Sequence, residues 1–268
     1  MKTGVPPSRS NDPATSPVVS MSVVIPARNE AAALPATLAS VFAELPRGGE
    51  VIVVDAGSTD ETAAVAAGLG AQVVRGAAGR GPQLIAGAAA ARGEVLLFLH
   101  ADTRLPERWA DAVNQTLEDP AVRLGAFTLR IDRPGRGYRV IEWGVARRCR
   151  RHSLPYGDQA LFMRADDYRA AGGFPDWPCF EDVALVKALR QAGRVVVHEL
   201  AVETSGRSWA EHGRTKTTVV NWLSIQAFRL RVPPKRIARL RALVSPRKTH
   251  KPQDSAKSHG LASTPAKV

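Results

Sequence analysis

The chain has 268 residues, of which 44% are hydrophobic and 23% are charged, as in soluble globular proteins. This composition excludes a disordered chain and a collagen-like repeat, and two cysteines, Cys149 and Cys179, are too few for a disulfide scaffold. A chain of this length can bury enough surface to fold without disulfides or a structural metal.

The net charge of +12 is unevenly distributed. Residues 233–268 hold nine Lys or Arg against one acid, Asp254, so this segment carries +8 and residues 1–232 carry +4. Basic segments either meet nucleic acid, anionic lipid or phosphorylated substrates, or are simply solvated. We expect residues 1–20, rich in Pro, Ser, Asn and Thr, to form a disordered extension. We expect residues 233–268 to form a basic, largely disordered tail.

No secretion signal or membrane span is predicted. The first residues lack the apolar core of about 7–15 residues that secretion needs, and no apolar run reaches the roughly 18 residues of a transmembrane helix. We therefore expect a cytoplasmic protein. The apolar residues of 219–230, with Trp222 and the cations that follow them, suit either a peripheral contact at the inner membrane face or a helix that covers the sheet.

Strand and helix patterns alternate through the first hundred residues. The expected strands are continuous apolar runs at 18–25, 50–54, 71–74 and 95–99. Helices are expected from near Asn29, from Ser58, where the residues suit an N-cap, and over 81–91. Apolar strands separated by helices indicate a parallel sheet covered on both faces. This half therefore predicts a doubly wound α/β unit.

The second half mixes its patterns. Further strands are expected at 124–131, 159–163 and 195–200, and further helices at 106–117, 181–191 and 209–230. Mixed strands added to a parallel core predict one continuous α/β domain over residues 21–232. We expect it to be Rossmann-like, with a mixed central sheet and helices on both faces.

Polar and charged residues follow four of the predicted strands. They are Pro26-Ala27-Arg28-Asn29-Glu30, Asp55-Ala56-Gly57-Ser58, residues 75–80 and His100-Ala101-Asp102. In open α/β sheets, ligands bind outside the carboxyl ends of the strands. Any one of these residues could simply cap the next helix, but together they predict one shared pocket.

Five segments resemble a family of glycosyltransferases. They are VVIPARNE (23–30), VIVVDAGSTDET (51–62), GRGPQLIAGAAAARGE (79–94), LLFLHADTRLP (96–106) and FEDVALVKALRQAG (180–193). The chain resembles a family 2 glycosyltransferase, which implies the GT-A fold, over about residues 21–230. GDQALFMR (157–164) and SGRSWAEHGR (205–214) further resemble a short bacterial subgroup linked to arsenosugar biosynthesis.

The resemblance implies a nucleotide-sugar donor. Asp55 would receive the base or ribose, because a carboxylate accepts N–H and O–H hydrogen bonds, and Arg80 would contact the base or diphosphate. The other donor-binding residues would be Pro26, Ala27, Arg28, Glu30, Arg207 and His212. Arg207 and His212 lie where related enzymes close a loop over the diphosphate. Simple structural roles stay open, as a helix cap for Asp55, a solvated cation for Arg80 and a helix start for 207–212.

The resemblance also implies a divalent cation, Mn²⁺ or Mg²⁺. His100-Ala101-Asp102 stands where the family carries a DxD-type element, so Asp102 would be the single direct ligand. The cation would neutralise charge on the leaving diphosphate. His100 departs from the family pattern. We expect it to pack against Asp102 or orient it rather than ligate, since Mg²⁺ prefers oxygen, although Mn²⁺ tolerates imidazole.

Glu181 and Asp182 precede a helix with apolar periodicity. Acids in a first helical turn interact favourably with the helix dipole, which is a structural explanation of this pair. The resemblance implies instead that one of them is the general base that deprotonates an acceptor hydroxyl. We expect Asp182 to be the base and Glu181 to position it.

These inferences predict an inverting, metal-dependent glycosyltransferase that moves a sugar from a nucleotide-diphosphate sugar to a hydroxyl acceptor. The sequence does not identify the acceptor, and a lipid-linked acceptor is one candidate. A sugar-nucleotide pyrophosphorylase is the alternative enzyme, but it needs a glycine-rich basic loop after the first strand, and PARNE is not one. A non-catalytic protein that binds nucleic acid or a membrane surface is the other alternative. We expect no nucleic-acid partner, because aromatics are only 6% of the chain and no helix-turn-helix or stacking signature is present.

Overall fold

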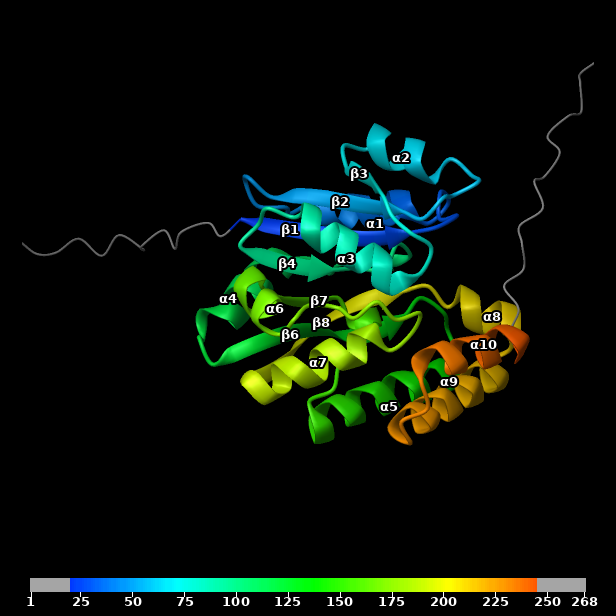
Figure 1. Cartoon of the computed structure of the whole chain (residues 1–268). Coiled ribbons are helices and arrows are strands. Elements are labelled where there is room, and N and C mark those ends of the chain that lie inside the picture. The colour runs from blue at the N-terminus through cyan, green and yellow to red at the C-terminus, as the bar shows by residue number, and fades with distance from the viewer. Residues whose placement is uncertain (1–19, 245–268) are drawn as a thin grey trace, which may run out of the picture.

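An eight-stranded mixed sheet runs through the centre of the computed structural model, which describes residues 20–244 (Figure 1). Its strand order is β3-β2-β1-β4-β7-β6-β8-β5. The strands are β1 (Met21–Ala27), β2 (Glu50–Asp55), β3 (Gln72–Arg75), β4 (Val95–Phe98), β5 (Thr103–Arg104), β6 (Val122–Ile131), β7 (Leu161–Arg164) and β8 (Arg194–Thr204).

The first half of the chain builds the parallel part of the sheet, as predicted. Strands β3, β2, β1 and β4 pair in parallel, and the helices between them are α1 (Leu34–Phe42), α2 (Thr62–Gly68) and α3 (Arg80–Ala90). Helix α3 packs closely on the sheet, because a Cβ on Gly87 would lie 2.3 Å from Val24 Cγ1. The carboxyl ends of β1, β2 and β4 therefore meet at one edge, where a ligand can bind.

The second half curls the sheet back toward that edge. Strand β7 pairs antiparallel with β4, and β6 pairs in parallel with β8, with register shifts at Val122/Leu124 and Phe127/Thr128. Such irregularities bend a strand and increase its twist. The end of β8 consequently returns to the loop after β4, where β5 pairs with it and Ser205 N–H donates to the Asp102 carbonyl at 3.1 Å.

The remaining helices cover the second half of the sheet or lie beside it (Figure 1). They are α4 (Trp109–Glu118), α5 (Arg136–His152), the short 3₁₀ helix η1 (Gly157–Gln159), α6 (Ala165–Ala170), α7 (Glu181–Ala192), α8 (Arg207–His212), α9 (Arg214–Arg229) and α10 (Pro234–Val244). The single helix predicted over 209–230 is wrong, because Gly213, with φ of +82°, divides it into α8 and α9. Within residues 20–244, no helix combines the length and apolar content needed to cross a bilayer.

The described structure continues past residue 232, the expected end of the domain, into α10. Helix α10 lies within the range assigned to the disordered tail, and its Ile237 is only 2% exposed, packed with Phe180 and Val183. Burial of this one apolar side chain, hidden among cations in the sequence, docks the helix. The expectations for residues 1–19 and 245–268 lie outside the described residues.

Replacing Ile237 with alanine should lower the free energy of unfolding by about 2–4 kcal/mol, because it removes a buried branched side chain and leaves a cavity. Urea denaturation would measure the change. Leu243→Ala is the matched control on the same helix, since Leu243 is 80% exposed and its loss should change stability by less than about 0.5 kcal/mol. Equal stabilities for the two variants would contradict the packing of α10.

Candidate active site

The loops after β1 and β2 are joined by reciprocal hydrogen bonds. Asn29 N–H donates to Ser58 Oγ at 2.9 Å, and Thr59 N–H donates to Asn29 Oδ1 at 2.8 Å. Asp60 accepts from the N–H groups of Ala31 and Thr62, at 3.2 and 3.1 Å. The side chains of Ser58 and Asp60 therefore hold the two loops together, while the N-cap of α2 is Glu61.

Asp55 ends β2 at the same edge and is only 8% exposed. Both of its carboxylate oxygens accept from Ser58 N–H at 3.2 Å, and Ser58 Oγ also donates to Oδ1. A carboxylate oxygen has a second lone pair, so this cap leaves Asp55 able to accept further bonds. The structural role and the proposed donor role are thus compatible.

The β1 residues expected to bind donor differ in character. Ala27 is buried, and its carbonyl accepts from Gln83 Nε2 at 2.9 Å and from Ala56 N–H at 3.1 Å, so its polar atoms serve the fold. Pro26 is half-buried in β1, and Arg28 is exposed just beyond the strand. Among the residues expected to bind donor at the end of β1, Glu30 is the one that contacts another predicted site residue, Arg207.

Arg207, at the start of α8, links Glu30 to Asp102. Its Nη2 donates to the two carboxylate oxygens of Glu30 at 2.8 and 2.6 Å and lies 3.9 Å from Asp102 Oδ2. Burial raises the pKa values of both carboxyls, and the Arg207 charge opposes the rise. The structure thus brings three of the predicted site residues together. His212 ends α8, and its side chain lies outside the described part of the chain.

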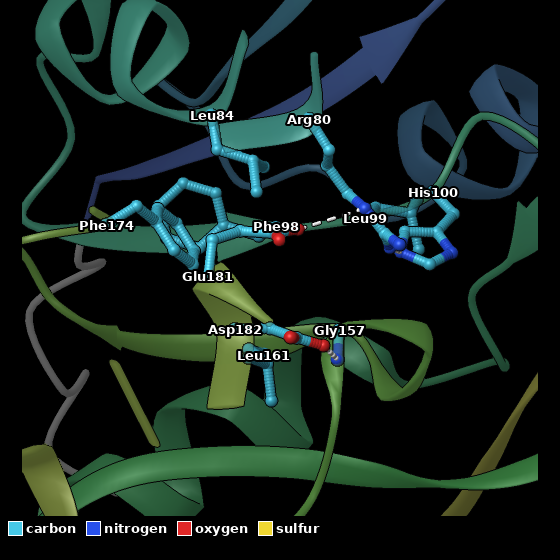
Figure 2. A pocket seen from close by; sticks show the side chains of 10 residues that line it. All are labelled: Arg80, Leu84, Phe98, Leu99, His100, Gly157, Leu161, Phe174, Glu181 and Asp182. Atoms are coloured by element: carbon cyan, nitrogen blue, oxygen red, sulfur yellow. Dashed lines mark hydrogen bonds and ion pairs between the residues drawn. The ribbon is translucent and has the colours of Figure 1, made fainter. Parts of the chain in front are cut away.

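Arg80 connects this group to the acids of α7. Its Nη1 lies 2.7 Å from His100 Nε2, and its Nε lies 3.0 Å from Glu181 Oε1 (Figure 2). The pKa of Arg80 is raised: burial opposes its charge, but the carboxylates Glu181, Asp182, Asp158 and Asp102 favour it. Carboxylates of α7, of η1 and of the loop after β4 therefore all stabilise the positive charge of Arg80.

His100 does not orient Asp102, contrary to expectation. An arginine can only donate, so His100 Nε2 must accept from Arg80 and the neutral ring carries its proton on Nδ1. Burial and the Arg80 charge lower the pKa of His100 to about 3. Neither ring nitrogen then has a lone pair available for a metal while the bond to Arg80 is kept.

The two acids at the start of α7 have different surroundings. Glu181 is fully buried, and burial raises its pKa, opposed by Arg80. Asp182 is half-buried, and its Oδ2 accepts from Gly157 N–H at 2.7 Å while Oδ1 accepts from Val183 N–H at 2.8 Å. Figure 2 shows Glu181 turned to Arg80 and Asp182 turned to Gly157. This division suits a positioning role for Glu181 and a reactive role for Asp182.

Asp158 is a candidate that the sequence analysis did not select. Its Oδ1 is buried without a hydrogen-bond partner among the described residues. Burial raises its pKa; Arg148 opposes the rise, and Asp182 adds to it. The sequence feature that could have indicated Asp158 is its place in the Gly157-Asp158-Gln159 segment. In this segment Gly157 N–H donates to Asp182, and Gln159 Nε2 donates to the Phe127 carbonyl at 2.9 Å.

A divalent cation fits this site only if most of its ligands come from elsewhere. Asp102 and Glu30 supply the oxygen chemistry that Mg²⁺ and Mn²⁺ favour, and burial disfavours their charges unless a cation is near. However, no three His, Cys, Asp or Glu side chains gather as a metal cluster within the described ranges. Asp102 would therefore hold the ion together with oxygens of a bound substrate.

The half-buried, neutral His100 predicts a specific pH dependence. The unfolded chain takes up a proton near pH 6.5 and the folded chain only near pH 3, so this histidine lowers stability as the pH falls through that window. Its contribution is at most about 1.4 kcal/mol per pH unit. His100→Gln should therefore lose stability less steeply between pH 6.5 and 4.5 in urea titrations, whereas His152→Gln, at an exposed position, should follow the parent chain. Identical slopes for all three proteins would contradict this assignment.

The chain matches a known family over more than half of its length. The model of "Glycosyl transferase family 2" matches residues 22–170, whereas a comparison with curated proteins finds no match. The fold is similar to that of several solved glycosyltransferases. One is the mannosyltransferase PcManGT from Pyrobaculum calidifontis, in complex with GDP-Man and Mn²⁺, with a TM-score of 0.60, 21% identity, and coverage of 84% of this chain and 70% of that one.

Two further structures are similar. Residues 1–349 of TarS from S. aureus match with a TM-score of 0.55 and 17% identity, over 75% of this chain and 64% of that one. Glucosyl-3-phosphoglycerate synthase from Mycobacterium tuberculosis, in complex with phosphoglyceric acid, matches with a TM-score of 0.52 and 22% identity, over 68% and 70%. The chain thus spans less than two thirds of the TarS fragment, and identities this low speak for the fold alone. With the curled mixed sheet and the family match together, the chain belongs to glycosyl transferase family 2 and has the GT-A fold.

Proposed function

We propose that this protein is an inverting, metal-dependent glycosyltransferase that moves a sugar from a nucleotide-diphosphate sugar to a hydroxyl acceptor. The observation that supports the proposal is the position of Arg80, which contacts His100, two residues before Asp102, and forms an ion pair with Glu181, beside Asp182. The donor would bind on the Asp102 side of Arg80, and the acceptor would bind on the Asp182 side. The segments at 157–164 and 205–214 support membership of the bacterial subgroup linked to arsenosugar biosynthesis.

Asp182 would act as the general base. The acceptor oxygen forms a bond to the anomeric carbon as the bond from that carbon to the diphosphate oxygen breaks on the opposite face, so the configuration inverts. The hydroxyl proton passes to Asp182, and the electron pair leaves with the nucleoside diphosphate. The amides of Gly157 and Val183 fix the orientation of this carboxylate.

On the donor side, Asp55 would accept hydrogen bonds from the base or ribose, while Arg80 and Arg207 would stabilise charge on the diphosphate. Pro26, Ala27, Arg28, Glu30 and His212 would complete the walls of the donor site. A divalent cation, Mn²⁺ or Mg²⁺, held by Asp102 and diphosphate oxygens, would neutralise the leaving group.

A thermal-shift panel tests the donor proposal. UDP-, GDP- and dTDP-sugars are added with and without Mn²⁺, since a ligand that binds the folded state raises its apparent Tm. We expect one nucleotide class to raise the Tm in a Mn²⁺-dependent manner, and that class then serves in assays of donor hydrolysis and transfer. A panel in which no donor shifts the Tm, with no hydrolysis, would overturn the proposal.

We also propose that the protein works at the cytoplasmic face of the inner membrane, on an acceptor that is lipid-linked or otherwise delivered there. Trp222 on α9 is 58% exposed and Leu243 on α10 is 80% exposed. Trp143 on α5 is also 58% exposed, with Arg147 over its ring at 5.5 Å. Exposed tryptophans beside cations suit the interface of an anionic bilayer.

Vesicle co-sedimentation tests this contact. Each cation near an anionic surface contributes about 1 kcal/mol, and salt screens it. We expect recovery with anionic vesicles at low salt, loss at high salt, and a reduced recovery for the Trp143→Ser/Trp222→Ser variant. Equal recovery in the supernatant with anionic and neutral vesicles at both salt concentrations would leave a soluble acceptor instead.

A further inference from the structure

A second pocket lies between α7, α9 and the turn before α10. Its volume is about 360 Å³, within the range of pockets that hold small molecules. The side chains around it are Trp177, Lys187, Phe228, Arg229 and Arg231, and the turn 232–234 completes its wall. None of these residues belongs to the donor or metal site proposed above.

Aromatic rings form one part of this pocket. Phe228 lines it, with its ring centroid 6.0 Å from that of Trp177 in an edge-to-face arrangement. Lys187 Nζ lies 5.0 Å from the centroid of the same ring. These contacts stabilise the positions of the rings, and the rings offer an apolar surface to the organic part of a ligand.

The charge of the pocket has one sign. Lys187, Arg229 and Arg231 line it, and no Asp or Glu is among the lining residues. Arg229 and Arg231 have no ion-pair partner within the described residues, although eight of the eleven salt bridges found there bury at least one partner to 33% exposure or less. Three cations around one cavity create a field that attracts an anion.

The pocket adjoins the proposed base through a single ring. Phe228 stacks on Phe180, with centroids 4.7 Å apart and planes at 19°, and Phe180 immediately precedes Glu181 and Asp182. On the other side of the same loop, a Cβ on Gly81 would lie 2.6 Å from the Trp177 carbonyl oxygen. A ligand in this pocket would therefore lie beside the acceptor side of the reaction.

Arg231 has a backbone conformation that favours glycine. Its φ is +63°, and it ends α9 with two hydrogen bonds, Arg231 N–H to the Phe228 carbonyl and Val232 N–H to the Ala227 carbonyl, both at 3.0 Å. This is the Schellman arrangement, in which glycine normally takes the left-handed position. An arginine at this strained position, with its side chain lining a cationic pocket, points to a role for the side chain.

We propose that this pocket binds the phosphate group of an organic phosphate, with the cations on the phosphate and the aromatic rings on its organic part. The inference deepens the proposed function, on which it rests in taking this ligand to be the acceptor. The same chemistry is offered by a soluble phosphate ester and by the headgroup of an anionic lipid.

Phenyl phosphate, measured by isothermal titration calorimetry without donor or metal, is the probe. We expect the parent protein to bind it at least fivefold more tightly than inorganic phosphate, because the rings contact the phenyl group. Lys187→Gln should weaken the binding at least fivefold. Arg231→Gly should weaken it similarly while leaving the Tm equal or higher, since glycine relieves the backbone strain. Arg239→Gln removes an exposed cation of α10 outside the pocket and should bind like the parent.

Vesicles of phosphatidylglycerol in phosphatidylcholine form a second arm. A larger loss of vesicle binding in Arg231→Gly than in Arg239→Gln identifies a lipid headgroup as the source, whereas equal vesicle binding by these two variants, with phenyl phosphate binding weakened in Arg231→Gly, identifies a soluble ester. Unchanged binding of both probes by Arg231→Gly and Lys187→Gln overturns the proposal, as does an equal loss of phenyl phosphate binding in Arg239→Gln. Donor-induced Tm shifts in the same variants report on the glycosyltransferase proposal separately.

Discussion

Replacing Asp182 by asparagine should reduce glycosyl transfer by about 10²–10⁴-fold, the usual contribution of a general base. The amide keeps the shape of the carboxylate, and its single oxygen can still accept from Gly157 N–H, while the Val183 N–H in the first turn of α7 loses its side-chain acceptor. The loss should appear in kcat, because the proton of the acceptor hydroxyl has no acceptor, while donor binding stays unchanged. Initial rates at saturating donor, with Tm as the folding control, measure both quantities.

Two variants sharpen this test. Asp176→Asn removes an exposed acid from the loop before α7, and its rate should stay within about twofold of the parent. Glu181→Gln should leave a slower enzyme with an altered pH profile, because Glu181 is buried against Arg80 and acts through its neighbours. An Asp182→Asn protein with the parent's kcat would assign the base to another group, and Asp158 would be examined next.

Replacing Asp102 by alanine should remove the dependence of turnover on Mn²⁺ and reduce turnover by roughly 10³-fold, since charge neutralisation at a leaving group is worth several kcal/mol. The fold should survive, because Asp102 contributes its backbone rather than its side chain to the sheet through the bond from Ser205 N–H. Electron paramagnetic resonance of Mn²⁺ in the presence of nucleoside diphosphate reports binding without turnover.

Asp111→Ala is the matched control for this prediction. Its side chain is 74% exposed on α4, so the variant removes the same charge from the protein without touching the site. We expect its Mn²⁺ titration to match that of the parent. If Asp102→Ala binds Mn²⁺ as the parent does, the ion has other ligands, and Arg207 would be the principal positive charge beside that carboxylate.

Strands β1, β2 and β4 of the parallel half were predictable because they are buried on both faces. Residues 51–54 of β2, for example, are apolar throughout, which permits little other than an interior strand. Strand β8 was predicted too short, at 195–200, since Glu203 interrupts the apolar pattern after Leu200 in a strand that is only half-buried. Strand β5 has two residues and forms only because β8 curls back to it, so no local pattern could reveal it.

The site residues also differ in how far the sequence predicts them. Asp55, Asp102 and Asp182 follow directly from strand and helix ends, where local sequence fixes the backbone. The pairing of His100 with Arg80, and of Arg207 with Glu30, depends on how distant loops meet. Helix α10 was missed because one buried isoleucine among cations gives little periodic signal. The residues that line the site were thus easier to predict from the sequence than the hydrogen bonds and ion pairs between them.

The contact between Glu30 and Arg207 joins residues 177 positions apart. On the ribosome, Glu30 and Asp102 emerge long before the arginine that lies between them, and β5 emerges before the strand it pairs with. A nascent chain that stops short of β8 therefore carries unneutralised carboxylates and an open sheet edge. Contacts this distant form late in folding, so a competent site exists only once nearly the whole catalytic domain has been translated and closed.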